Sequence, residues 1–588
     1  MIRPPQARLN ILAPTVAYAA ALIDRSGCVA LLDTWLKEDD ERTTSSGTGA
    51  YPIRALLIGL YLLIVTRQPI SWASLLQLFW FQLDREQAVS LGLEGTIDPA
   101  RQRWLMTYAD DVDATWPRDA LRAQQSEYAR LTRSLDRMFS TIRWSPHDRT
   151  GKKTNGTLKQ RMRALTEEDL AALQIKKDRH DLLINTLIAA SVDRDAMAPH
   201  RGDIMFDEVV IQVAKTLGNT GTSANRLHAG NPDAGWWQKG DKDTPRWGHG
   251  ATFIMATHRP GQKRIPTVVV GMSLGKPTGG STAETLLAVD EAQRSGLLQP
   301  WTGRGKSHYA IADMGFTHKD GLNKALVERG YYLVQDYPER LGRRSVISRP
   351  SQASDTTGGQ SSTAVVTNTG PTLFNGVLIC PGFDPVTLTA FDPLPANASK
   401  AERNEHEQRE KQLLAGRMPT NGRPEVARQG GRGRPRADAE QGVGMRIQAQ
   451  CPAAALQCRC PLVPESMELD AETPTVPRPP RLDNLPYVCA KTTSPVLLTD
   501  KQFKQYGRHL FGSTDHQTLY SYARSLNEQW HSQLRADHTG GIDGNVFNTL
   551  GIERIGVIIA LAVAETNQAM QRSFRQRHRP NDHSLMAA

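Results

Sequence analysis

Three charged residues near the C-terminus share one face of an expected helix. Arg524, Glu528 and Arg535 follow the spacing R-x3-E-x6-R. Because an α-helix turns through roughly 100° per residue, these positions fall within about 40° of one another, and Tyr520 and His531 join the same face. One carboxylate flanked by two guanidinium groups suits a site that binds both a divalent cation and phosphate groups.

Two further acids lie upstream, each in an apolar run. Asp207 lies within IMFDEVVI, and Asp313 ends HYAIAD. An unpaired buried carboxylate is costly, so an Asp inside an apolar strand favours a functional role. Asp203 competes with Asp207 but lies outside the apolar run, and Glu208 should point to the opposite face of the strand. Asp313 precedes Met-Gly-Phe and could instead cap a turn.

The third acid also has competing interpretations. Glu528 could be one member of an ordinary surface ion pair with Arg524, since residues four apart are neighbours on a helix. Glu553 and Glu565 are alternative third acids, but both lack the flanking basic residues. The joint occurrence of three acids in this order favours Asp207, Asp313 and Glu528.

This set resembles the DDE transposases of bacterial insertion sequences, especially those with a Y-R-E-K signature around the third acid. In that signature the basic residue seven positions after the Glu is normally Lys, and here it is Arg535. The Tyr position three before the Arg holds Ser521, with Tyr520 and Tyr522 on either side.

The resemblance implies DNA cleavage assisted by Mg²⁺, which Mn²⁺ can replace. Two Mg²⁺ ions about 4 Å apart activate the attacking oxygen and absorb charge on the phosphate, and Mg²⁺ prefers carboxylate oxygens. The expected catalytic and metal-binding residues are Asp207, Asp313 and Glu528. The expected DNA- or phosphate-binding residues are Arg524, Arg535, Tyr520 and His531.

The elements that would position these acids follow the order of a ribonuclease H-like fold. The pattern predicts strands at 203–213, 251–258 and 265–273, a helix at 281–295, a strand at 308–312, a helix at 319–329 and a strand at 331–335. The fold class is therefore predicted to be α/β, with a mixed sheet flanked by helices. The first and fourth strands carry the two Asp residues.

Four regions are expected along the chain. They are an all-α N-terminal, DNA-binding region (1–196), the first part of the catalytic core (197–340), a β-rich insertion (341–500), and a C-terminal helical part that carries the third acid (501–588). Helices are predicted at 51–65, 71–83, 123–139, 158–190, 519–535 and 548–570, and insertion strands at 373–380, 386–391 and 445–450. Residues 395–444 are charged and Gly-rich, which predicts a disordered basic linker; its segment RGRPR resembles an AT-hook.

The 588-residue chain has a formal net charge of +10, which favours a polyanion such as DNA as partner, although solubility alone also explains it. No apolar run approaches 20 residues, so we expect a cytoplasmic protein, nucleoid-associated when bound to DNA, without a membrane segment. The resemblance implies double-stranded DNA partners, namely element ends and target, and a homodimer or higher oligomer on paired ends.

Cysteines allow a second kind of metal site. Four thiolates could bind zinc, but the spacing C-x6-C-x1-C is unfavourable for chelation, so a structural zinc is not expected and reduced buried thiols are favoured. These four cysteines are Cys451, Cys458, Cys460 and Cys489. Cys28 and Cys380 look isolated in the sequence.

The sequence therefore predicts a transposase that cleaves DNA at insertion-sequence ends and joins them to target DNA. Two alternatives remain open. One is a hydrolytic nuclease of the same fold, and the other is a non-catalytic DNA-binding protein derived from a decayed transposase.

Overall fold

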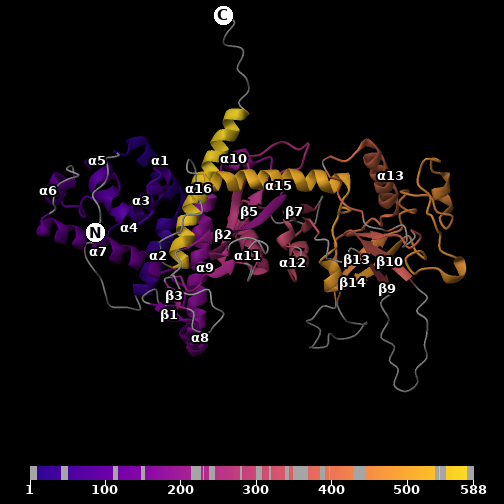
Figure 1. The fold of residues 1–588 in the computed structure, drawn as a ribbon, viewed down its shortest axis with the longest axis horizontal. Helices are drawn as coiled ribbons and strands as arrows, with labels where there is room; N and C mark the ends of the chain where they lie inside the picture. The colour runs from indigo at the N-terminus through magenta and orange to yellow at the C-terminus, as the bar shows by residue number, and fades with distance from the viewer. Residues whose placement is uncertain are drawn as a thin grey trace, which may run out of the picture.

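The computed structural model describes residues 10–40, 51–109, 117–147, 152–213, 227–229, 231–237, 245–277, 281–299, 307–316, 319–337, 344–348, 369–383, 388, 391–395, 397–427, 444–536, 542 and 551–578. The protein is a mixed α/β structure (Figure 1). N-terminal helices form one end, a six-stranded sheet lies in the middle, and the insertion forms the other end.

The central sheet has the strand order β6-β5-β2-β7-β8, with the short β4 also paired to β5. β5 is antiparallel to both β2 and β6, whereas β7 is parallel to β2 and β8. The bounds are β2 Ile204–Gln212, β4 Gly235–Trp237, β5 Arg246–Ala256, β6 Val268–Gly275, β7 His308–Ala312 and β8 Tyr331–Gln335. Each long strand overlaps a predicted one, and β7 and β8 match the predicted bounds.

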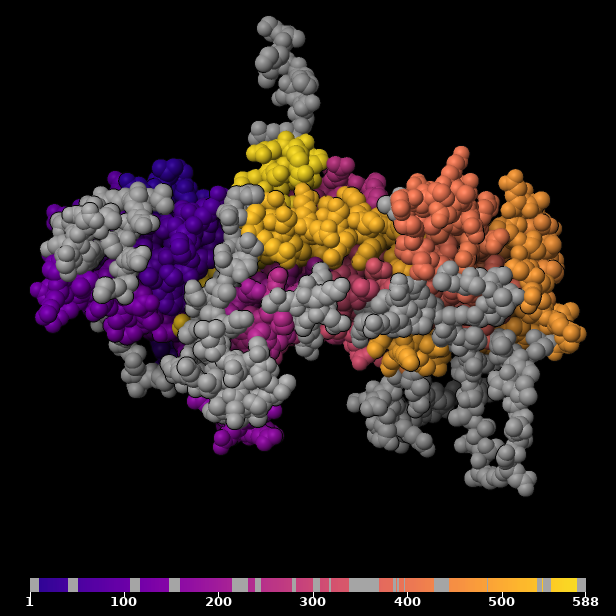
Figure 2. All heavy atoms as spheres, viewed as in Figure 1, coloured from indigo at the N-terminus to yellow at the C-terminus, as the bar shows by residue number. Residues whose placement is uncertain are grey.

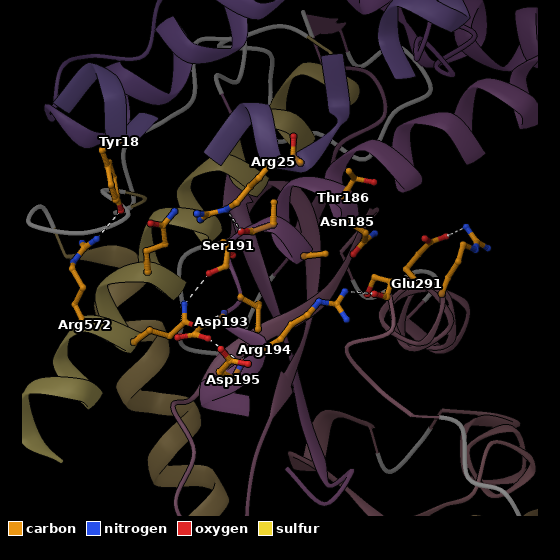
Figure 3. A pocket seen from close by; sticks show the side chains of 18 of the residues that line it. Tyr18, Arg25, Asn185, Thr186, Ser191, Asp193, Arg194, Asp195, Glu291 and Arg572 are labelled. Carbon is orange, nitrogen blue, oxygen red and sulfur yellow. Dashed lines mark hydrogen bonds and ion pairs between the residues drawn. The ribbon is translucent and has the colours of Figure 1, made fainter. Parts of the chain in front are cut away.

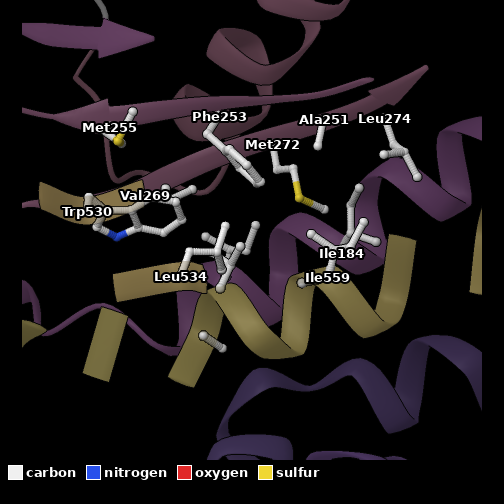
Figure 4. Packing of buried hydrophobic residues seen from close by; sticks show 14 of the residues in the cluster. Ile184, Ala251, Phe253, Met255, Val269, Met272, Leu274, Trp530, Leu534 and Ile559 are labelled. Carbon is white, nitrogen blue, oxygen red and sulfur yellow. The ribbon is translucent and has the colours of Figure 1, made fainter. Parts of the chain in front are cut away.

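Helices cover both faces of this sheet. On one face, α11 (Ser281–Arg294) and α12 (Leu322–Glu328) pack on Ile204 and Phe206 of β2. On the other face, α9 (Glu167–Ala190), α15 (Thr514–Arg535) and α16 (Ile552–Arg577) pack on the alternate strand residues. Figure 4 shows this second core, where Trp530 of α15 and Ile559 of α16 face Phe253 of β5. Asp207 therefore belongs to the face covered by α15.

The helix predicted at 158–190 is two helices, α8 (Asn155–Ala164) and α9. Thr166 caps the second helix, because its side chain accepts from the Asp169 N–H while the Asp169 carboxylate accepts from the Thr166 N–H. α9 packs against β6 and α16, so the predicted boundary at 196 does not separate it from the sheet. The region is also not purely helical, since β1 (Lys152–Thr154) pairs with β3 (Leu227–Ala229).

Two helices of the second layer approach closely at a glycine. A Cβ atom on Gly556 of α16 would lie 2.3 Å from Nε2 of His180 on α9. Any larger residue would therefore have to displace the buried His180 ring or the helix that carries it. The contact fixes α16, and through it α15, relative to the sheet.

The remaining N-terminal helices pack on α16 and on one another. They are α1 Ala13–Ser26, α2 Cys28–Asp40, α3 Ile53–Val65, α4 Trp72–Gln77, a π-helical turn Leu78–Gln82, α5 Arg85–Ser90, α6 Pro99–Ala109, α7 Arg118–Ser140 and α10 Arg194–Met197. Glu565 of α16 ties them to the core, because it accepts hydrogen bonds from Tyr18 (2.8 Å) and from buried Tyr61 (2.7 Å). In the described residues, only the bent pair α1 and α2 has the combined length and apolar character of a membrane span, and no single helix does.

The insertion contains two small antiparallel sheets. One has the order β11-β10-β9 and the other β12-β13-β14. The bounds are β9 Arg344–Ser348, β10 Thr369–Phe374, β11 Val377–Ile379, β12 Glu425–Val426, β13 Met445–Gln450 and β14 Thr493–Leu498. Asn375 and Gly376 have φ of 44° and 87° and form the two-residue β10–β11 turn, which requires such conformations.

The prediction of disorder throughout 395–444 was wrong for its first part. Lys400–Gly416 form helix α13, which begins with a capping box between Ser399 and Glu402. The helix carries few apolar residues, so its sequence resembles a solvated linker. The AT-hook-like segment and the rest of the predicted linker from 428 to 443 lie outside the described residues.

α13 also contacts the start of α15. The Glu410 carboxylate accepts from the Thr514 N–H (2.9 Å) and from its hydroxyl (2.8 Å). A negative charge at a helix N-terminus is favourable because the first N–H groups lack partners within the helix. The insertion thereby fixes the beginning of the helix that carries the third predicted acid.

Candidate functional site

Asp207 and Asp313 lie on adjacent parallel strands. The last paired residues of β2 and β7 are Phe206 and Ala312, so one further step along both strands brings the two Asp residues side by side. Glu208 points the other way, as predicted, since its carboxylate lies near Glu284 of α11. The two Asp side chains thus lie together on the face of the sheet that α15 covers.

A short turn fixes Asp313. The 3₁₀ turn Met314–Phe316 follows it, and the Gly315 N–H donates to Asp313 Oδ1 at 2.8 Å. Phe316 anchors the turn by an edge-to-face contact with Phe206, with ring centroids 4.8 Å apart. The turn-capping interpretation is therefore right, but it involves only Oδ1, while Oδ2 faces Arg524.

Arg524 joins the three predicted acids. Its Nη1 lies 4.0 Å from Asp207 Oδ2 and 3.8 Å from Asp313 Oδ2, and its Nε lies 3.0 Å from Glu528 Oε1. Nη1 is buried and makes no hydrogen bond within the described residues. Burial opposes the charge, but the carboxylates, Asp207 foremost, outweigh it and hold the pKa of Arg524 above its ordinary value. One guanidinium thus bridges three carboxylates from separate segments and offsets part of their negative charge.

Sequence reasoning missed Asn527, which donates to Asp207 Oδ2 at 2.9 Å. His531 lies beside it, with Nε2 3.5 Å from the same oxygen. Burial, helped by the charges of Arg535 and Arg524, lowers the pKa of His531 to about 3, so the imidazole is neutral at neutral pH. The signal for Asn527 was its place in the stripe 524, 527, 528, 531, which covers one helix face.

The tyrosines around Ser521 point in different directions. Tyr520 stacks on His516, with ring centroids 5.7 Å apart, and burial followed by the negative charge of Asp336 raises its pKa. Tyr522 instead bonds to His258 Nε2 at 2.6 Å. Arg535, in the last turn of α15, is exposed. The site therefore includes Tyr520, while Arg535 lies at its margin.

The competing acids have other roles. Asp203 is 1% exposed and accepts two bonds from Arg259, at 2.6 and 2.8 Å, and one from the Tyr309 N–H. Glu565 holds the N-terminal tyrosines, and Glu553 is buried in α16. Asp207, by contrast, has a side chain 19% exposed at an accessible edge. Figure 2 shows that α15 lies on the surface between the N-terminal helices and the insertion.

The cluster has the right donors for a hard divalent cation. Two carboxylate oxygens, one from each Asp, face the same cationic group, and Mg²⁺ prefers such oxygens. As the side chains stand, no three His, Cys, Asp or Glu groups of the described residues converge on one point. Arg524 occupies the position between the acids, so a metal ion would bind there only after its guanidinium moves aside.

A large hollow of about 910 Å³ lies elsewhere, between α1, α9, α11 and α16 (Figure 3). Its arginines are bound within the protein. Arg25 donates to Ala190 O at 2.7 Å, Arg194 to Ser295 O at 2.8 Å, and Arg572 pairs with Glu565 at 2.8 Å. Among the acids that line this hollow, Asp193 pairs with Arg575 and Glu291 with Arg294.

No known protein family matches the sequence, and no curated protein is significantly similar to it. Function is therefore inferred from the residues of the sheet edge. They combine three carboxylates, a bridging guanidinium and a neutral imidazole over the middle of β2 and the end of β7. Such a group can bind a divalent cation and a phosphate together.

Proposed function

We propose that this protein is a metal-dependent phosphoryl-transfer enzyme of the ribonuclease H-like type. Support comes from the strand order β6-β5-β2-β7-β8, with the first three strands antiparallel and the last two parallel to β2. The observation that carries the proposal is the contact of Arg524 with Asp207, Asp313 and Glu528. These acids come from the first strand, the fourth strand and a C-terminal helix.

More particularly, we propose a DDE transposase of a bacterial insertion sequence. The resemblance around Glu528 and the net charge of +10 support DNA as the substrate. The enzyme would act as an oligomer on paired ends, cleave at the element ends and join the 3′-hydroxyls to target DNA. Ser521 and Arg535 depart from the signature, while the charges of Asp313 and Asp207 contribute to the raised pKa of Tyr520.

The residues of the site have separate roles in the proposed reaction. Asp207 and Asp313 would hold the cation, and Glu528 would add a third carboxylate from the helix. Asn527 orients the Asp207 carboxylate through its 2.9 Å hydrogen bond. Arg524, displaced from the acids, is free to bind a phosphate with its planar fork. When bound, Mg²⁺ activates the attacking oxygen and stabilises charge on the phosphate.

The test is Mg²⁺-dependent cleavage and strand transfer on DNA that carries the ends of the surrounding element. The wild type is compared with Asp207→Asn, Asp313→Asn and Glu528→Gln. Glu208→Gln is the matched control, because its side chain is next along β2 but points to the opposite face. We expect the three site variants to lose chemistry while still binding DNA, and the control to remain active.

The assay also separates the alternatives. Strand transfer from a pre-nicked end distinguishes a transposase from a nuclease that only hydrolyses DNA. A wild-type protein that binds element ends and never cuts them would instead favour a decayed transposase. Activity that survives Glu528→Gln would place the third acid elsewhere.

A further inference from the structure

Five of the six cysteines line one small cavity in the insertion. They are Cys380, Cys451, Cys458, Cys460 and Cys489. Cys380, which looked isolated in the sequence, belongs to this group and interacts directly with Cys489. All five thiols are free of disulfide bonds.

Four separate segments bring these thiols together. Cys380 follows β11, and its N–H donates to Gly416 O at 2.9 Å. Cys451 follows β13, and its N–H donates to Thr492 O at 2.8 Å, beside the start of β14. Cys489 precedes β14 and closes a turn by donating to Pro486 O at 2.8 Å. Backbone hydrogen bonds therefore hold the walls of the cavity.

The segment 451–492 has little regular structure to keep it in place. It contains only two short 3₁₀ turns, Pro464–Glu468 and Leu482–Asn484, and Leu456 has a φ of 59°. Irregular segments longer than about 12–15 residues are uncommon in compact proteins. A cross-link at the point where Cys451, Cys458 and Cys460 meet Cys380 and Cys489 would hold this segment.

We propose that this thiol cluster binds one zinc ion, with Cys380 and Cys489 as two ligands and two of Cys451, Cys458 and Cys460 completing a tetrahedral set. The cavity has a volume of about 10 Å³, which suits a single ion or water-sized sphere. Zinc prefers thiolate ligands, and structural sites commonly use four cysteines. The sulfurs line the cavity without converging on one point, so binding requires rotation of the cysteine side chains.

This site shares no residue with the acidic cluster and does not depend on the proposed enzymatic function. The remaining lining residues are apolar or proline, namely Pro452, Ala453, Leu462, Val463, Val476 and Pro480. They offer no competing hard oxygen side chain for Mg²⁺. Four of the cysteines are near one another in the sequence, and the fold adds Cys380, which lies 71 positions before Cys451.

The experiment measures the metal content of the full-length protein, purified under reducing conditions and then supplied with Zn²⁺ and freed of excess ion. We expect about one zinc per chain. Cys380→Ser and Cys489→Ser should each lose most of the zinc. Cys28→Ser is the matched control, because Cys28 is buried in α2, far along the chain from the cluster.

A second measurement uses the wild type alone, in case the variants do not fold. A mercurial reagent is titrated onto the thiols while released zinc is followed with a metal-sensitive dye. Zinc release in step with thiol modification, and a thiolate charge-transfer band after replacement by Co²⁺, support the site. A protein without zinc after loading, zinc retained in both cluster variants, or a disulfide among the five cysteines would overturn it.

Discussion

Asn527 donates a hydrogen bond of 2.9 Å to Asp207, although the two residues are 320 positions apart in the chain. Nε2 of His531 lies 3.5 Å from the same carboxylate oxygen, Asp207 Oδ2. α15 therefore does more than present Glu528. It also fixes the direction of the Asp207 carboxylate on the central strand, and this relationship leads to the first prediction.

Asn527→Ala should lower the rate of DNA cleavage about 10- to 100-fold, the usual effect of losing a group that orients a metal ligand. DNA affinity should change little, because Asn527 is buried and faces the strand. Single-turnover cleavage and a gel-shift assay measure the two effects. Gln529→Ala, an exposed position on the same helix, is the control. An unchanged cleavage rate would show that Asp207 needs no such support.

Arg524→Gln should bind divalent cations more tightly than the wild type, because the competing guanidinium is gone. Without metal, the same variant should lose about 1–2 kcal/mol of unfolding free energy, since three neighbouring carboxylates repel one another. Mg²⁺ should restore the loss. Calorimetric Mn²⁺ binding and thermal unfolding with and without Mg²⁺ test this, with exposed Arg535→Gln as control. Equal cation affinity in the wild type and Arg524→Gln would contradict it.

Asp203→Asn should destabilise the fold by about 3–5 kcal/mol, because it leaves Arg259 without its buried charge partner. Asp207→Asn should change stability by less than about 1 kcal/mol, since Asp207 lies beside another carboxylate at an accessible edge. Urea unfolding at neutral pH measures the stabilities of the two variants and distinguishes them. If both variants unfolded at the same urea concentration, the division into a structural and a functional acid would be wrong.

His531 should make stability depend on pH. Its pKa is lowered to about 3 in the folded state, below the ordinary value of about 6.5. The unfolded chain therefore takes up a proton that the folded chain does not, so this contribution is complete above about pH 6.5 and falls as the pH drops toward 3.

Between pH 7 and 5.5 the loss from this residue is about 1 kcal/mol. His531→Gln should remove that share of the pH dependence, measured as urea unfolding at both pH values. The exposed His578→Gln serves as control. An identical pH dependence in His531→Gln and the wild type would mean that folding does not lower the pKa of His531.

Regular elements with clear apolar periodicity were predictable. The strands His308–Ala312, Tyr331–Gln335 and Met445–Gln450 were predicted with their observed bounds, because each is a short apolar or alternating run between polar residues. The shared face of Arg524 and Glu528 also followed from helical spacing alone. These features depend on local sequence, so the periodicity of a single sequence was enough to predict them.

Features that depend on tertiary contact were not predictable. The helix Lys400–Gly416 looked like a linker, because it is stabilised by its cap and by a few buried residues such as Leu413. Cys380 joined its cluster only through the approach of distant loops. The bridging contacts of Arg524 likewise required the helix to be placed over the sheet edge, which no periodicity specifies.

The contact between Glu410 and Thr514 has a consequence for engineering this protein. Shortening the chain by removing the insertion would delete the carboxylate that caps α15 while leaving every strand of the central sheet intact. Ser513 would still cap the helix that bears Glu528, but the Thr514 N–H and hydroxyl would lose their acidic partner. A substitute acidic residue placed ahead of Thr514 would restore this contact in a version of the protein without the insertion.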